Sequence, residues 1–148
     1  MGTAGALSLL PQKPTKPLFV MNSYILMEVN FHQLLSFRQD NNAKATLCVR
    51  EYDFQVPYGV IKANRHQVRQ IDEKPIQRFF VSAGIYVLEP SVIQLIPKVQ
   101  FFDMPQLLEK ILNKKTGVSA FPIHEYWIDI GRITDLELAK CEFSTAFQ

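Results

Sequence analysis

One stretch, Gln70 to Tyr86, constrains the fold more than any other, because it joins two strand-like runs through a charged turn. Polar and apolar residues alternate before the turn, and β-branched and aromatic residues dominate residues 79–87 after it. In the turn Glu73-Lys74-Pro75, proline keeps Lys74 out of helical geometry and ends the first strand. A glycine within a strand, here Gly84, often marks a bulge or the close approach of a ligand. The stretch therefore predicts a carboxylate and an ammonium at a strand end, facing a glycine.

Size and charge bound the class of protein. The 148 residues, 47% hydrophobic and 20% charged, predict a single domain over residues 1–148 with one sizeable core. Sixteen basic and fourteen acidic side chains leave a net charge of +2, which is too balanced to indicate a nucleic-acid or anionic-membrane partner. No apolar run reaches the length of a membrane span, and the N-terminus does not resemble a signal peptide. Cys48 and Cys141 lack metal-type spacing, which favours reduced thiols in a cytoplasmic protein.

Helix and strand patterns alternate along the rest of the chain. Three capping patterns open helices at Asn30, Asp103 and Thr134, the second with Gln106 as its reciprocal partner. Strands are predicted over residues 18–21, 45–52, 60–61, 68–71, 79–87 and 118–123, and short helices over residues 3–10, capped by Thr3, and 91–96. Strands that alternate with helices, together with adjacent strand pairs, favour an α/β sandwich with a mixed sheet.

The turn residues Glu73 and Lys74 are candidates for binding chemistry. A carboxylate accepts hydrogen bonds from sugar hydroxyls, and an ammonium binds phosphate as a point charge. The same triplet is also typical of a solvated hairpin turn. At the N-terminus, Gly2 and Gly5 predict free backbone N–H groups at a helix start, which suits an anionic ligand, although small residues that pack a short helix give the same pattern.

Asp129 is the one acidic residue of an otherwise apolar segment, between Ile128 and Ile130. Burying a carboxylate is costly unless it is paired or ligates a metal ion. An aspartate that caps the following turn at Gly131 explains the same pattern. The residues alone leave both interpretations open.

Six short segments occur in one order along the chain, and together they are more specific than any of them alone. They are Gly2-Thr3-Ala4-Gly5-Ala6-Leu7, Phe19-Val20-Met21-Asn22, Val56-Pro57-Tyr58-Gly59-Val60, Glu73-Lys74-Pro75, Ala83-Gly84-Ile85-Tyr86 and Trp127-Ile128-Asp129-Ile130-Gly131. This order resembles the sugar-phosphate nucleotidyltransferase family, the nucleotide-sugar pyrophosphorylases, from Gly2 to about Ala139.

The resemblance implies a Rossmann-like three-layer α/β/α sandwich that joins a sugar 1-phosphate to a nucleoside triphosphate with Mg²⁺ and releases pyrophosphate. It also implies roles for matched residues. Gly2, Thr3 and Gly5 would line the nucleoside pocket. Gly59 and Glu73 would contact the sugar, Lys74 would bind its phosphate, and Ala83 and Gly84 would contact the other face of the sugar. Asp129 would be one of two metal carboxylates, and Asp129 and Lys74 would be catalytic. Charge neutralisation by the metal and the lysine would do most of the catalysis.

Three departures from the family pattern matter. The Gly-rich loop GGxGTRLxPLT, which cradles the triphosphate, does not occur in this sequence, so the resemblance implies an N-terminally truncated domain. The family's Asn-Gly-Asp metal motif is Asn22-Ser23-Tyr24 here, and a phenol is a poor Mg²⁺ ligand at neutral pH. Ser82 replaces the asparagine that precedes Ala-Gly. Retention of Mg²⁺ is therefore not expected.

Three functions are compatible with these departures. The first is a nucleotidyltransferase-like protein without activity alone that retains weak binding of a sugar 1-phosphate or nucleotide. The second is a transferase completed by another chain. The third is a structural or interaction protein that forms a homodimer through an open strand edge at Leu18–Met21, with Leu9, Leu10, Leu18 and Phe19 buried against the partner.

Overall fold

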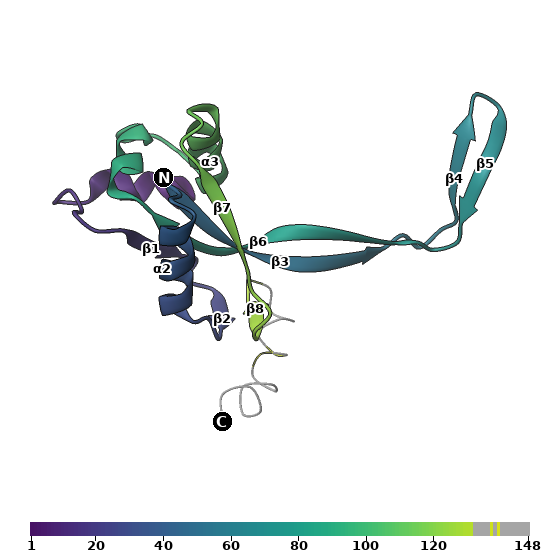
Figure 1. Cartoon of the computed structure of the whole chain (residues 1–148), viewed down its shortest axis with the longest axis horizontal. Coiled ribbons are helices and arrows are strands. Elements are labelled where there is room, and N and C mark those ends of the chain that lie inside the picture. Colours follow the sequence, from purple (N-terminus) through teal and green to yellow (C-terminus); the bar gives the residue numbers. More distant parts are fainter. Residues whose placement is uncertain (132–136, 138, 140–148) are drawn as a thin grey trace. The chain divides into compact units, whose positions relative to one another are not determined.

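The computed structural model describes residues 1–131, 137 and 139, and the chain divides into two compact units (Figure 1). Unit 1 comprises Met1–Val49 and Ser82–Gln148, and unit 2 comprises Arg50–Val81. Assignment of one domain to residues 1–148 stays a prediction. The helix predicted to open at Thr134 falls outside the described residues. None of the helices within the described ranges is long and apolar enough to cross a membrane.

A four-stranded mixed sheet organises unit 1. Its strand order is β1-β6-β3-β7, formed by β1 (Leu18–Met21), β6 (Ile76–Leu88), β3 (Ala45–Gln55) and β7 (Val118–Pro122). Strand β1 runs antiparallel to β6, whereas β3 and β7 run parallel, which confirms the predicted mixed sheet. A second, antiparallel sheet pairs β2 (Ile25–Met27) with β8 (Trp127–Asp129).

Helices cover both faces of this sheet, and the alternation of residues along β6 explains why. Tyr86 and Leu88 point into one core, whereas Ile85 and Val87 point into the other, because successive strand residues face opposite ways. The first core contains side chains from α1 (Gly2–Gly5), η2 (Pro90–Leu95) and α3 (Met104–Asn113), with η1 (Ala6–Leu9) packed against it; the second contains Leu34 of α2 (Phe31–Asp40) and Ile123. The result is the predicted three-layer α/β/α arrangement (Figure 1).

Two of the predicted helix starts are confirmed. Asn30 Oδ1 accepts hydrogen bonds from the backbone N–H groups of His32 and Gln33, both at 3.1 Å. Asp103 precedes α3, and its own N–H donates to Gln106 Oε1 at 2.8 Å. The predicted cap at Thr3 is wrong, because α1 starts one residue earlier and Met1 takes the cap position.

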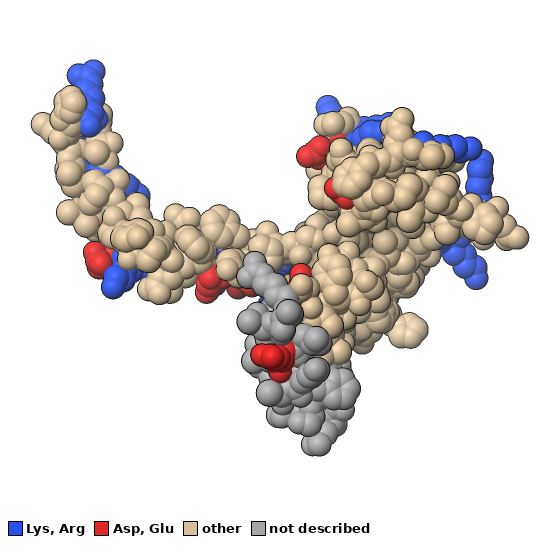
Figure 2. Space-filling view, turned by 180° about the vertical axis from the view of Figure 1, so that it is seen from behind, with Lys and Arg blue, Asp and Glu red and all other residues tan. Residues whose placement is uncertain are grey.

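Unit 2 is a ribbon without a core of its own. Strands β4 (Val60–Asn64) and β5 (Gln67–Asp72) form an antiparallel hairpin, and no side chain of Arg50–Val81 is fully buried. In the remainder of the ribbon, Arg78 lies 2.8 Å from Asp53 and 3.5 Å from Glu51. Figure 2 shows Lys and Arg side chains gathered at the free end of the β4–β5 hairpin. Strand β5 ends just before the turn Glu73-Lys74-Pro75 and β6 begins just after it, which confirms the strands predicted on both sides of this turn.

Candidate functional site

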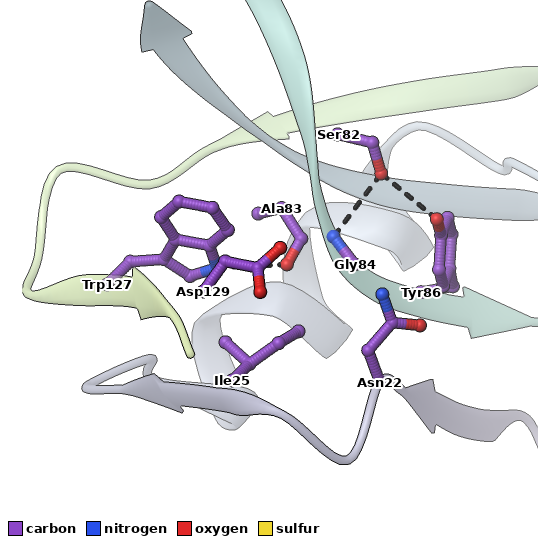
Figure 3. A pocket seen from close by; sticks show the side chains of 8 residues that line it. All are labelled: Asn22, Ile25, Ser82, Ala83, Gly84, Tyr86, Trp127 and Asp129. Carbon is purple, nitrogen blue, oxygen red and sulfur yellow. Dashed lines mark hydrogen bonds between the residues drawn. The ribbon is translucent and has the colours of Figure 1, made fainter. Parts of the chain in front are cut away.

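A pocket of about 160 Å³ opens in unit 1 beside the bend of β6 (Figure 3). Three segments distant in sequence form it: the residues that follow β1, the middle of β6, and β8. Its lining residues are Asn22, Ile25, Ser82, Ala83, Gly84, Tyr86, Trp127 and Asp129. The pocket thus gathers three of the site residues that the sequence predicted, Ala83, Gly84 and Asp129.

Gly84 allows the chain to close around this pocket. Its φ is +72°, which residues with a side chain rarely adopt, although Gly84 lies within strand β6. A Cβ on Gly84 would lie 2.7 Å from Asn22 Nδ2 and 2.8 Å from Ile25 Cδ1. The Gly84 carbonyl also accepts a hydrogen bond from the Asn22 N–H at 3.0 Å. The close approach that the strand glycine predicted is therefore made by the chain itself, at Asn22.

Hydrogen bonds hold the polar groups of the pocket in place. Ser82 Oγ lies 3.0 Å from the Tyr86 hydroxyl and accepts a hydrogen bond from the Gly84 N–H at 3.3 Å (Figure 3). Trp127 Nε1 donates to the Ala83 carbonyl at 2.9 Å, which fixes the indole ring against β6. Hydroxyl groups both donate and accept, so the lining offers both kinds of partner to a ligand.

Asp129 lies at the end of β8 and is exposed. One carboxylate oxygen, Oδ1, accepts a hydrogen bond from the Gly131 N–H at 2.9 Å, so the turn-capping interpretation describes its contact in this structure. The pairing of β2 with β8 places Ile25 opposite Asp129, and the Ile130 N–H donates to the Tyr24 carbonyl at 2.9 Å. Tyr24 therefore lies beside the segment that carries Asp129.

These groups do not fit a Mg²⁺ site with two carboxylates. Mg²⁺ is held in proteins through carboxylates and water, in near-ideal octahedral geometry. Asp129 supplies one carboxylate, whereas Tyr24 supplies a phenol whose oxygen accepts a hydrogen bond from Asn22 Nδ2 at 3.3 Å. No group of three or more His, Cys, Asp or Glu residues gathers within the part of the chain that the structure describes. The metal role of Asp129 stays a prediction from the resemblance.

The predicted nucleoside residues lie in α1, against the residues that precede α3. The N–H groups of Ala4 and Gly5 donate to the Phe102 carbonyl at 3.0 and 2.9 Å, and the Thr3 N–H donates to Asp103 Oδ1 at 2.8 Å. A Cβ on Gly2 would lie 2.6 Å from the Phe102 carbonyl oxygen. Within this structure these backbone groups serve contacts in the chain, and their role toward a nucleoside stays a prediction.

Gly59, Glu73 and Lys74 belong to unit 2. Gly59 and Glu73 lie together, because a Cβ on Gly59 would be 3.0 Å from Glu73 Oε2. Lys74 has a φ of 46°, and its carbonyl accepts a hydrogen bond from Gln55 Nε2 at 3.4 Å. The structure thus brings Gly59 and Glu73 to one place. Their contact with a sugar stays a prediction. Whether Glu73 and Lys74 face Gly84 stays a prediction, since Gly84 belongs to unit 1.

Four lining residues were not predicted as site residues: Asn22, Ile25, Tyr86 and Trp127. Three of them lie within the segments that carry the resemblance, but two of these, Tyr86 and Trp127, are aromatic strand residues that are equally typical of a core. Ser82 was noted only as a departure from the family. A signal was present in Asn22, a polar residue directly after an apolar strand, where side chains tend to meet a ligand.

The chain was compared with protein families and with known sequences. The family model described as nucleotidyl transferase matches residues 2–145. The chain is 32% identical over 152 residues to a mannose-1-phosphate guanyltransferase of Yarrowia lipolytica, covering 95% of this chain and 40% of that protein. It is 34% identical over 158 residues to the protein of the same name of Debaryomyces hansenii, covering 99% and 42%. The chain therefore spans about two-fifths of the length of these relatives.

Solved structures have the same fold. A putative glucose-1-phosphate thymidylyltransferase from Bacillus anthracis, solved in complex with a sucrose, superposes with a TM-score of 0.69 at 17% identity, over 95% of this chain and 60% of that one. HddC from Yersinia pseudotuberculosis superposes with a TM-score of 0.66 at 25% identity, over 96% and 62%. These folds are Rossmann-like, as the resemblance implied. Because the family model spans nearly all of its residues, the chain belongs to the sugar-phosphate nucleotidyltransferase family.

Proposed function

We propose that this chain binds the sugar of a sugar 1-phosphate in the pocket around Gly84, and that by itself it does not join that sugar to a nucleotide. The carrying observation is the convergence of an amide, two hydroxyls and a carboxylate around the bare backbone of Gly84. Sugar hydroxyls need donors and acceptors together, which Asn22, Ser82 and Asp129 provide. Trp127 adds an apolar surface at the same opening.

The size of the pocket supports a ligand of about one sugar ring. Typical pockets for drug-sized ligands measure about 300–1,000 Å³, and this one measures about 160 Å³. Of the predicted ligands, the sugar ring of a sugar 1-phosphate therefore matches the volume of this pocket better than a whole nucleotide sugar does. Mannose 1-phosphate is the first ligand to test, because the relatives are named for it. With few contacts to offset the cost of immobilising the ligand, we expect a Kd on the order of millimolar.

The absence of catalysis is proposed from two sequence features. The Gly-rich triphosphate loop of the family does not occur in this chain, and Tyr24 stands at the position of one metal carboxylate. Removing one electrostatic element of an active site costs about 10²–10³ in rate. Losing two such elements would reduce the rate of transfer by about 10⁴–10⁶. The groups around Asp129 do not fit Mg²⁺, because Tyr24 supplies a phenol where a second carboxylate is needed.

Binding is tested by titrating ¹⁵N-labelled protein with mannose 1-phosphate and with glucose 1-phosphate. We expect amide shifts at Asn22, Gly84 and Asp129, and, if the predicted sugar contacts of unit 2 also act, at Gly59 and Lys74. Asp129→Asn keeps the shape of the side chain but removes its charge, and it should weaken binding several-fold. The control Asp40→Asn, on the exposed end of α2, should not change binding. Shifts confined to other surfaces would refute the pocket.

Activity is tested separately by pyrophosphate release from GTP, mannose 1-phosphate and Mg²⁺. We expect no release above background, and release by the isolated chain would refute the second half of the proposal. Release that appears only when another protein supplies a Gly-rich triphosphate loop would support the alternative of a transferase completed by another chain.

A second candidate function is an interaction protein that forms a homodimer, and the position of β1 favours it. Strand β1 lies at one edge of the four-stranded sheet, and its one neighbour there is β6. The Asn22 N–H donates to the Gly84 carbonyl, one residue beyond the Met21–Ile85 pair of the β1–β6 register. Because N–H groups alternate in direction along a strand, those of Phe19 and Met21 point to the open edge. Both side chains are exposed, by 40% and 47%. An open edge with apolar side chains invites strand pairing with another chain.

A further inference from the structure

A second hollow, of about 470 Å³, lies open at the tip of the β4–β5 hairpin. Only residues of the turn and its flanks line it, namely Asn64, Arg65, His66, Gln67 and Arg69. Basic side chains gather at this end of the hairpin (Figure 2). None of these residues belongs to the sugar pocket or to the motifs that carry the family resemblance.

Arg65 lies at a turn position whose backbone conformation favours glycine, asparagine or aspartate. Asn64 pairs with Gln67, so the loop consists of Arg65 and His66 alone. Two-residue hairpin loops favour Asn-Gly and similar pairs, because they require positive φ. Arg65 has a φ of 52°, which is unfavourable for a bulky residue. A position that breaks the local rule without a structural gain is where function is expected.

A bulge brings a second arginine to the same hollow. In the hairpin register Lys62 pairs with Gln70 and Ala63 with Val68, which leaves Arg69 as the extra residue. A bulge of this kind bends the strand and redirects the side chain. Both guanidinium groups therefore line one hollow, although they come from opposite sides of the turn.

The positive charge at the tip is not neutralised. No acidic residue occurs between Val60 and Ile71. Lys62 is already paired, because its Nζ lies 3.3 Å from Asp72 Oδ2 and 3.3 Å from Gln70 Oε1. The side chains of Arg65, His66 and Arg69 make no hydrogen bond or ion pair with another residue in the part of the chain that the structure describes.

We propose that this hairpin tip binds the phosphate group of a small phosphorylated molecule. A guanidinium presents parallel N–H donors that match two phosphate oxygens, and Asn64 and Gln67 add amide donors beside the two arginines. No Phe, Tyr or Trp side chain lines the hollow, and His66 supplies its one aromatic ring, so the large stacking platforms of single-stranded nucleic-acid sites are missing. No apolar side chain lines it either, which disfavours insertion into a lipid surface.

The test uses the full chain and inorganic pyrophosphate as the probe. Titration of ¹⁵N-labelled protein at low salt should shift the amides of residues 64–69, and Arg69→Gln should weaken binding roughly tenfold, as expected for loss of a charge-assisted contact. Failure of the sugar pocket to bind mannose 1-phosphate would leave this result unaffected, since the two sites share no residue. Absence of shifts at residues 64–69 would overturn the proposal.

Arg65→Gly separates binding from folding, because glycine relieves the positive φ while it removes the charge. We expect a higher urea midpoint together with roughly tenfold weaker binding. The matched control is Lys115→Gly, which removes a basic residue with a φ of 55° from the end of α3 and should raise the midpoint without changing binding. Unchanged pyrophosphate affinity in Arg65→Gly would contradict the proposal. So would tighter binding of a short single-stranded DNA or of phosphatidylserine vesicles at the same residues, which would assign the tip to a macromolecule.

Discussion

At the residue scale, Gly84 is the position where one added methyl group tests the pocket. In Gly84→Ala the Cβ would overlap Asn22 Nδ2 at 2.7 Å and Ile25 Cδ1 at 2.8 Å, on a backbone with a φ of +72°. Strain of about 1–2 kcal/mol and overpacking of about 1–3 kcal/mol should lower the free energy of unfolding by roughly 2–5 kcal/mol, measured in urea. Gly117→Ala is the control, because its φ is +88° but the nearest heavy atom is 3.7 Å away. Equal losses in the two variants would contradict the crowding around Gly84.

Cys48 allows a pH-dependent prediction at the same scale. Burial, and then the negative charge of Glu125, raises the pKa of Cys48 from 9.0 to about 12. In a Cys141→Ser background, the native thiol should therefore resist a disulfide reagent at pH 8 and react once urea unfolds the chain. The folded pKa lies above the unfolded one, so the stabilisation by the neutral thiol is complete below pH 9.0 and is lost as the pH rises toward 12. Cys48→Ala should remove this loss, and fast labelling of the native protein would contradict the burial.

At the scale of elements, a residue of α1 caps α3. The Met104 N–H donates to Thr3 Oγ1 at 2.8 Å, and Thr3 Oγ1 lies 3.2 Å from Asp103 Oδ1. Thr3→Val keeps the branched shape but leaves the Met104 N–H without its partner. The free energy of unfolding should fall by about 1–2 kcal/mol, as for other lost caps. Thr3→Ser keeps the hydroxyl and should lose much less; equal stability of all three proteins in thermal denaturation would show that the contact contributes nothing.

At the scale of the whole molecule, the open edge of β1 predicts association. Met21 is 47% exposed, and its N–H points away from β6. If two copies pair along this edge, light scattering at micromolar concentration should detect a dimer, and Met21→Lys should shift it toward the monomer, because a charge on an edge strand opposes pairing. Leu112→Lys, on the exposed face of α3, is the control and should leave the mass unchanged. A monomer at that concentration in the unmodified protein would contradict the homodimer.

Much of the fold could be predicted from local patterns. The caps at Asn30 and Asp103 depend on residues two or three positions apart, and the structure confirms both. Alternation along Ile85–Leu88 follows from the period of the predicted strand, and it assigns these side chains to two cores. The order of six short segments predicted the family from Gly2 to about Ala139, and the family model, which matches residues 2–145, confirms it. Caps and strand period depend on residues that are close in sequence, and the family signal depends on the order of segments along the chain. Predicting them requires no knowledge of which distant segments come into contact.

The sequence by itself thus determined the four strands of the mixed sheet, the starts of α2 and α3, the family and the candidate status of Gly84 and Asp129. Only the tertiary structure decided that Asn22 closes against Gly84, that Asp129 bonds to Gly131 within its own turn, and that Thr3 serves α3 rather than α1. It also gathered Arg65 and Arg69 around one hollow through a turn and a bulge. The reason is physical: periodicity and capping act over one or two turns of chain, whereas a pocket depends on which donors remain unpaired after distant segments have packed together.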